Sequence, residues 1–100
     1  MDFEKAWRYL MKNSPISLRT SGNTDFIAKV YDDSISYKSR NDQERPQSKE
    51  NFRIYFDIWF KEGRKESKYF PNFGERQSPS ARYRYFSSVF RYLDTVKDKI

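Results

Sequence analysis

The side chains that most often carry catalysis or bind metals are absent from this 100-residue sequence. It contains no histidine and no cysteine, which removes the usual general base, the usual soft metal ligands and any disulfide. Acid–base or metal chemistry would therefore depend on carboxylates. Five of these fall in or near one predicted hairpin: Asp25, Asp32, Asp33, Asp42 and Glu44.

A nuclease-like site needs an acidic pair and a lysine arranged around a divalent ion. Asp32, Asp33 and Lys38 supply these residue types, but an Asp pair before Ser34 is also typical of a tight turn. No nucleophile motif and no glycine-rich phosphate loop accompanies them, and the chain has only three glycines. We therefore expect no enzyme, no metal site and no cofactor.

The strongest pattern is a basic segment with interleaved aromatic residues, residues 61–91, which holds eight Lys or Arg residues against three Glu. Cations neutralise phosphates and release counterions, and exposed rings stack on unpaired bases. We predict nucleic-acid contacts from Lys65, Lys68, Arg76, Arg82, Arg84, Arg91, Tyr69, Tyr83 and Tyr85. Arg84 and Arg91 are seven positions apart and share one side of a predicted helix.

The same segment has other interpretations, which stay open. A charged run is often only a solvated surface, and a tyrosine can bury its ring while its hydroxyl reaches water. Arg and Tyr are also enriched at protein interfaces. The favoured hypothesis is a non-catalytic small binding module associated with nucleic acid. The alternative is a protein–protein interaction or inhibitor module, with an acidic partner or a second copy in a homodimer, and no nucleic-acid contact.

Three amphipathic helices are predicted, because apolar residues recur at intervals of three and four. They cover residues 2–13, 49–62 and 79–98. Asp2, Ser48 and Ser78 are the predicted N-caps. Pro15 stops the first helix and Gly63 stops the second.

Between the first two helices the apolar period changes to two. Phe26, Ala28 and Val30 alternate with other residues, and Ile35 and Tyr37 continue the pattern after a turn at 32–34. This pattern predicts an antiparallel hairpin. Because two strands alone are marginally stable, we expect a third.

The third strand is expected from residues 16–20 or 67–71, unless dimerisation completes the sheet. Residues 39–48 are wholly polar and are predicted to form a loop. Residues 63–78 are predicted to form an irregular basic connection. Its three aromatic residues indicate that at least one of them lies under the fold.

The predicted fold is a single α+β domain over residues 1–100, with a small antiparallel β-hairpin or meander packed by three helices in the order α-β-β-α-α. Hydrophobic residues make up 36% of the chain and aromatic residues 19%, so a few large side chains must fill the core. The predicted core consists of Trp7, Leu10, Phe26, Val30, Phe52, Phe56, Trp59, Phe86, Phe90 and Leu93.

The net charge of +6 is concentrated in the second half of the chain. Residues 1–50 hold nine basic and eight acidic residues, whereas residues 51–100 hold eleven and six. No apolar run approaches the roughly 20 residues of a membrane span. The start of the chain lacks the features of a secretory signal. Together with the absence of cysteine, this favours a cytoplasmic location.

Overall fold

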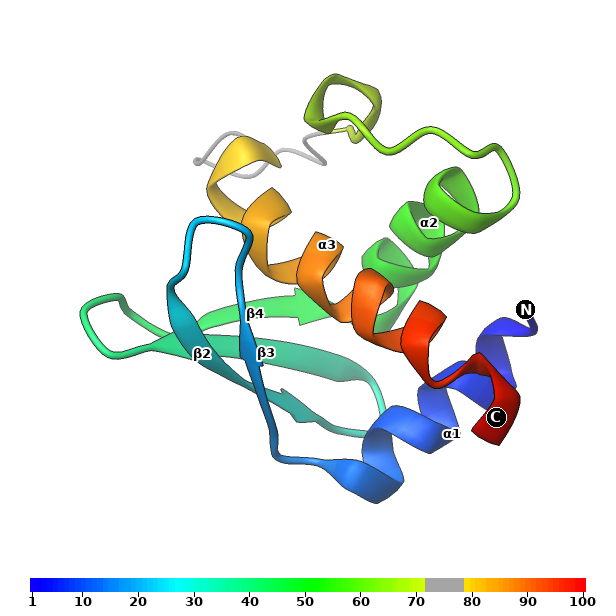
Figure 1. Cartoon of the computed structure of the whole chain (residues 1–100), viewed down its shortest axis with the longest axis horizontal. Helices are drawn as coiled ribbons and strands as arrows, with labels where there is room; N and C mark the ends of the chain where they lie inside the picture. The colour runs from blue at the N-terminus through cyan, green and yellow to red at the C-terminus, as the bar shows by residue number, and fades with distance from the viewer. Residues whose placement is uncertain (72–78) are drawn as a thin grey trace.

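The computed structural model describes residues 1–71 and 79–100, and its architecture is α+β, as predicted (Figure 1). The elements are α1 (Phe3–Asn13), β1 (Ile16–Arg19), β2 (Asp25–Val30), β3 (Ser34–Ser39), β4 (Arg45–Ser48), α2 (Lys49–Phe60), the 3₁₀ helix η1 (Ser67–Tyr69), α3 (Pro79–Thr95) and the 3₁₀ helix η2 (Lys97–Lys99). The four strands form one antiparallel sheet in the order β1-β2-β3-β4. The sheet is therefore a meander in which each strand pairs with its neighbour in sequence.

The helix ends follow the capping chemistry of the sequence. The side chains of Asp2 and Ser48 each accept a hydrogen bond from the backbone N–H three residues later, at 2.9 and 3.1 Å. Gly63 has a φ of +67° beyond the end of α2, a left-handed conformation that favours glycine. Ser78, the predicted cap of the third helix, lies outside the described residues. That helix ends at Thr95, and the remainder of the predicted range continues as η2.

The predicted hairpin is confirmed as β2 and β3, with buried residues at alternate positions. Phe26 lies opposite Leu18 on one side and Ser39 on the other, and Ala28 lies opposite Ile16 and Tyr37. The third strand forms at the first of its two predicted places. At the second, residues 67–69 form η1 instead.

A fourth strand lies where the sequence predicted only a loop. β4 pairs with β3 between Ser34↔Ser48 and Tyr37↔Arg45. Its Gln47 is buried, and the Gln47 Oε1 atom accepts a hydrogen bond from the Tyr37 hydroxyl at 2.6 Å. The prediction of a loop over 39–48 is therefore wrong for 45–48. These residues carry no apolar alternation, and Pro46 is tolerated because β4 is an edge strand.

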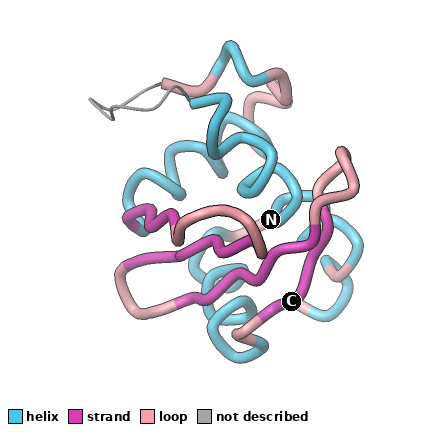
Figure 2. The backbone as a smooth tube through the Cα atoms, turned by 90° about the vertical axis from the view of Figure 1, so that its left-hand side faces the viewer, coloured by secondary structure: helices cyan, strands magenta, loops and turns pink. Residues whose placement is uncertain are grey.

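The helices cover one face of the sheet and leave the other face uncovered. α1 packs on β2, α2 packs on β3 and β4, and α3 packs on β1. In Figure 2 the strands lie in front of the helices. Exposed residues alternate with buried ones along β2 and point to the uncovered side. We call this side the outer face of the sheet.

All ten predicted core residues are buried, and none is more than 7% exposed. The centre of the core is Phe90 of α3, whose ring centroid lies between 5.1 and 6.1 Å from the rings of five other residues. These are Phe52, Phe56, Trp59, Phe60 and Phe86. Within residues 1–71 and 79–100, no helix has the length and apolar character needed to cross a membrane.

Replacing Phe90 with alanine removes the ring that all these neighbours contact. We expect Phe90→Ala to lower the free energy of unfolding by about 4 kcal/mol, through lost burial and the cavity left behind. Chemical denaturation followed by circular dichroism measures it. Ile54→Ala on α2, where the side chain is 36% exposed, is the control and should change stability by less than about 1 kcal/mol. Equal losses in the two variants would contradict the central role of Phe90.

Candidate functional site

The basic connection after α2 is held against the helices by buried aromatic contacts. Phe70 is 3% exposed, and its ring centroid lies 5.3 Å from that of Tyr55 and 5.0 Å from that of Phe86. The Tyr83 hydroxyl donates a hydrogen bond to the Lys65 carbonyl. The prediction that an aromatic residue of this connection lies under the fold is confirmed for Phe70. The segment therefore has a fixed position over the first half of α3.

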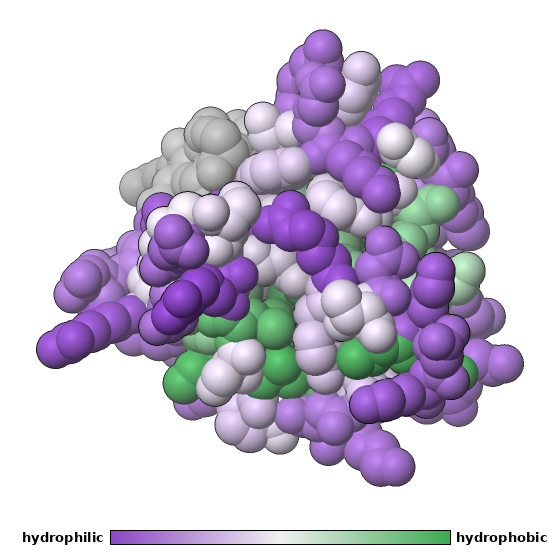
Figure 3. Space-filling model, viewed as in Figure 1, coloured by the Kyte–Doolittle hydropathy of each residue, from purple (hydrophilic) through white to green (hydrophobic). Residues whose placement is uncertain are grey.

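Its outer side presents a tyrosine ring beside two cations, with a third cation near the Trp59 ring. Tyr69 is 39% exposed. The Arg64 Cζ atom lies 5.1 Å from its ring centroid and the Lys68 Nζ atom lies 5.3 Å from it. The Lys65 Nζ atom lies 5.4 Å from the centroid of the Trp59 ring. We call Arg64, Lys65, Lys68 and Tyr69 the Tyr69 cluster. Figure 3 shows hydrophilic side chains over the region where Figure 1 places η1.

The carboxylates near the Tyr69 cluster neutralise it only weakly. Glu62 lies 3.9 Å from Arg64 and Glu66 lies 3.4 Å from Lys68, and every one of these four side chains is more than half exposed. Exposed pairs of this kind contribute little, and salt screens them. Lys65 forms no ion pair with any described residue. Phosphates can therefore compete for these cations.

Tyr85 is not available for stacking, which corrects the prediction. It is 1% exposed, and its ring stacks on Tyr37 with centroids 5.7 Å apart and planes 12° apart. Phe26 packs against it edge-on at 5.0 Å. The helical pattern placed Tyr85 on the flank of α3, but the sheet covers that flank as well. Tyr83 is also partly enclosed, because its ring contacts those of Phe70 and Phe86.

The predicted arginines do not join the Tyr69 cluster. Arg84 pairs with Asp42, with 3.1 Å between Nη2 and Oδ2. Arg82 lines a hollow formed mainly by residues 41–46 of the β3–β4 loop. Arg91 lies two turns after Arg84 and donates to the Ser87 and Ser88 hydroxyls. Arg76 lies outside the described residues.

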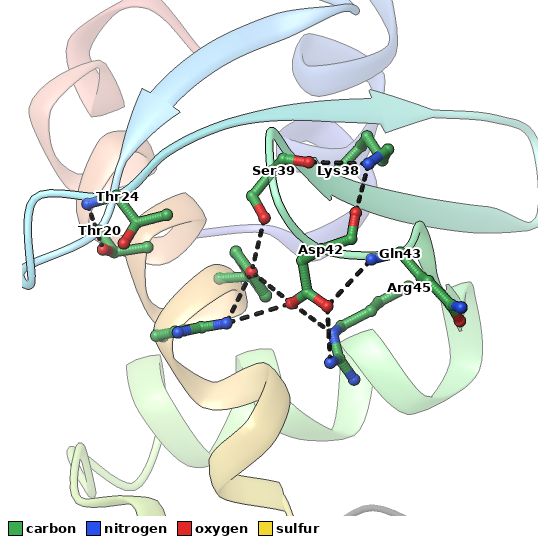
Figure 4. A network of polar contacts seen from close by, with 9 residues as sticks. Thr20, Thr24, Lys38, Ser39, Asp42, Gln43 and Arg45 are labelled. Carbon is green, nitrogen blue, oxygen red and sulfur yellow. Dashed lines mark hydrogen bonds and ion pairs between the residues drawn. The ribbon is translucent and has the colours of Figure 1, made fainter.

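Asp42 connects the β3–β4 loop to α3 through several donors. Its carboxylate accepts hydrogen bonds from Nε and Nη2 of Arg45 at 3.0 Å, from the Tyr85 hydroxyl at 2.9 Å, from Arg84, and from the Gln43 N–H at 3.0 Å. Figure 4 shows the carboxylate within this network. The hydrogen bonds from Arg45 hold the pKa of Asp42 well below its usual range, and Tyr85 lowers it further.

This network makes Asp42 a structural group. A carboxylate with so many donors cannot act as a general base near neutral pH, because its pKa is too low. Arg84 also takes part in this network, with its side chain 49% exposed. In the described part of the chain, no group of three or more acidic side chains is placed to hold a metal ion.

The residues considered for a nuclease-like site are not brought together. Asp32 and Asp33 lie in the turn between β2 and β3, whereas Lys38 lies near the other end of β3. Lys38 donates to the Ser39 carbonyl at 2.8 Å and to the Asp42 carbonyl. The turn interpretation of the Asp pair is supported by the hydrogen bond from Tyr31 N–H to the Ser34 carbonyl at 2.8 Å.

Two features of the surface were not predicted from the sequence. Arg64 belongs to the Tyr69 cluster, although only its neighbours were selected. Ile27 is 40% exposed on the outer face of the sheet, and Tyr31, just after β2, is 49% exposed. Their signal was present in the sequence, since Ile27 takes an exposed position of the alternation in β2 and Tyr31 continues that alternation just after the strand.

Comparisons with protein-family models, with curated proteins and with solved structures found no match for this chain. The function must therefore be argued from the geometry of the described residues.

The Asp42 network gives a prediction about stability. Replacing Asp42 with asparagine weakens hydrogen bonds to two arginines, so we expect the free energy of unfolding at pH 7 to fall by about 2 kcal/mol. Urea denaturation measures the change. The matched control is Asp25→Asn, because Asp25 also pairs with an arginine, Arg19, but both side chains are mostly exposed. We expect no resolvable change there.

Comparing wild type with Asp42→Asn also predicts how stability depends on pH. The pKa of Asp42 is lower in the folded chain than in the unfolded chain, so its carboxylate stabilises the fold above about pH 4 and this contribution is lost at lower pH. The stability difference between wild type and Asp42→Asn should therefore shrink as the pH falls from about 5 toward 2. A constant difference over this range would exclude the proposed role of the charge.

Proposed function

We propose that this chain is a non-catalytic binding module that contacts nucleic acid through the Tyr69 cluster. The observation that carries the proposal is an exposed tyrosine ring with a guanidinium and an ammonium close to it, at 5.1 and 5.3 Å. Proteins that bind single strands combine the same elements, because cations follow the phosphates while bases stack on aromatic rings.

The construction of the segment supports this role. Phe70 and Tyr83 fix the backbone of the Tyr69 cluster against the helices, so little ordering is required when a ligand binds. The surrounding carboxylates are exposed and weakly paired. A phosphate can replace such a partner at small cost. The module needs no cofactor in this proposal, and we place it in the cytoplasm because the chain has no cysteine.

The first test removes charge from the Tyr69 cluster. We expect Lys65→Gln/Lys68→Gln to weaken binding of labelled oligonucleotides several-fold at roughly 50 mM salt, and to reduce the slope of log affinity against log salt by about 0.7 to 0.9 for each lost phosphate contact. Fluorescence anisotropy at roughly 50 and 200 mM salt measures both quantities.

Lys97→Gln/Lys99→Gln is the matched control. It removes the same charge from η2, which lies far from η1 in Figure 1. If the two double variants lose affinity equally, only net charge matters and the Tyr69 cluster is not the site. If wild type binds no oligonucleotide at the lower salt concentration, the proposal fails.

A second test concerns the ring. Tyr69→Leu keeps an apolar side chain but removes the stacking surface, which contributes about 1–3 kcal/mol per base in single-strand binders. We expect a loss of about tenfold for single-stranded oligonucleotides and little change for duplexes of the same length. An unchanged single-strand to duplex ratio would show that Tyr69 does not stack on bases.

A protein-interaction role is the second candidate, and a different surface favours it. Ile27 exposes apolar area on the outer face of the sheet and Tyr31 does so just after β2, and exposed apolar area is one feature of contact sites. We propose that any protein partner binds this face.

A further inference from the structure

A hollow lies on the outer face at one end of the sheet, where three neighbouring strands run side by side. The side chains that line it on this face are Ser17, Arg19, Asp25, Ile27, Lys38 and Arg40. The register places Ile27 between Ser17 and Lys38, so its exposed side chain stands at the middle of the hollow. We call it the Ile27 hollow.

The Ile27 hollow is positively charged. It has three cations, at Arg19, Lys38 and Arg40, and Asp25 is its one carboxylate. Arg19 already neutralises that carboxylate with hydrogen bonds of 2.8 and 3.4 Å. Arg40 is exposed and makes no hydrogen bond or ion pair within residues 1–71 and 79–100. The hollow thus suits a ligand with an apolar part and a negative charge.

A segment with an aromatic ring and two negative charges lies at the other end of β2. Tyr31, Asp32 and Asp33 form the turn between β2 and β3, all three are exposed, and Tyr31 is 49% exposed. Neither Asp side chain makes a hydrogen bond or ion pair with a described residue. We call these three residues the acidic tip. It offers one ring and two carboxylates, of which Asp33 also borders a hollow beside Phe3, Ser48 and Lys49 on the side of the sheet that the helices cover.

We propose that the outer faces of two copies of this chain pack together as a two-fold dimer, with the acidic tip of each copy in the Ile27 hollow of the other. The inference stands apart from the nucleic-acid proposal, because none of these residues belongs to the Tyr69 cluster. It is carried by the match between two surfaces of opposite charge, each of which has a large side chain with much of its area exposed, 40% for Ile27 and 49% for Tyr31.

The positions of the two surfaces allow a closed pair. Ile27 lies in β2, and Tyr31 follows the end of this strand at the same alternate position, about 13 Å further along the chain. If two copies place their β2 strands antiparallel across a two-fold axis near Lys29, each tip meets the partner's hollow at the same time. Such an interface is self-complementary and closes after two copies. Two sheets can pack face to face in this way.

The pairing should be weak and sensitive to salt. The face has two strands about 20 Å long, β2 and β3, and two about 13 Å long, β1 and β4, all about 4.8 Å apart. It covers on the order of 300 Å² in projection, which belongs with small transient interfaces. The axis also brings two exposed Lys29 side chains close together, and like charges oppose association. We therefore expect a dissociation constant in the micromolar range rather than a permanent dimer.

A nucleic acid is a poorer occupant of the Ile27 hollow. Its exposed centre is aliphatic, and Phe26, the aromatic residue that contributes to its floor, is only 2% exposed. Unpaired bases stack on flat rings, which this surface does not offer. In the proposed dimer a tyrosine ring covers Ile27 and brings the acidic tip close to Arg19 and Arg40.

The test is sedimentation equilibrium of the full chain between about 10 and 500 µM, at roughly 50 and 300 mM salt, a range that brackets a weak interface and changes screening. We expect a monomer–dimer equilibrium that shifts toward monomer at the higher salt concentration. Wild type that stays monomeric throughout, or that forms open-ended assemblies, would overturn the two-fold dimer.

Charge exchange makes the test specific. Variant T reverses the tip (Asp32→Lys/Asp33→Lys), and variant H reverses the hollow (Arg19→Glu/Arg40→Glu). Each variant alone places like charges opposite each other, so we expect at least a tenfold loss of self-association in both. An equimolar mixture restores both tip–hollow contacts, so the mixture should form a one-to-one dimer about as tightly as wild type.

Folding and nucleic-acid binding are followed in the same variants. Circular dichroism checks that T and H fold, and their oligonucleotide affinity per monomer reports the Tyr69 cluster separately. Recovery of dimer in the mixture supports the proposal. If T and H still self-associate as wild type does, or if the mixture of folded variants stays monomeric, the tip does not occupy the hollow. Competition for dimer formation by an oligonucleotide would likewise assign the hollow to nucleic acid and overturn it.

Discussion

The rest of this fold depends on the packing of the aromatic side chains of α3 against their neighbours. Only 36% of the residues are hydrophobic, so the core relies on large rings, each of which buries about 150–250 Å². Phe90 contacts rings of α2, and Phe86 contacts Tyr55 and Phe70. Tyr85, one position earlier, packs on the sheet. One helix therefore joins α2, η1 and the strands.

This arrangement also positions the candidate site. The backbone of η1 is fixed because Phe70 is inserted between α2 and α3, while its neighbours Lys68 and Tyr69 point outward. A basic segment that would otherwise be a linker thus becomes a surface of defined shape. The Asp42 network has a comparable effect on the opposite flank of α3, where it binds Arg84 and Arg45 into the fold. Arg84, one of the arginines predicted to contact nucleic acid, is therefore paired within the fold.

The sequence predicted the elements whose apolar residues repeat with a clear period. The predictions were wrong where residues are buried by polar pairing or by a second neighbouring element. Trp7 of α1, Phe56 of α2 and Phe90 of α3 each belong to an apolar pattern with helical spacing, and all three are buried as expected. β4 has no such period. It forms because β3 offers an unpaired edge, and its buried Gln47 is satisfied by the Tyr37 hydroxyl, a contact that residue types alone do not reveal. Tyr85 was misplaced for a related reason, since a helical pattern indicates one buried face and α3 is covered on two.

The Tyr69 cluster and the outer face of the sheet lie on different sides of the molecule, so both can be occupied at the same time. Figure 1 shows η1 on the far side of α3 from the sheet, so pairing through the outer face leaves both Tyr69 clusters exposed. A dimer would then present two weak cationic sites on one particle. A nucleic acid long enough to reach both would bind the second site intramolecularly, which raises apparent affinity without any new contact. By linkage, such a nucleic acid would also strengthen the dimer, because it binds two joined copies more tightly than two separate ones. Short oligonucleotides cannot reach both clusters, so their binding should be independent of protein association.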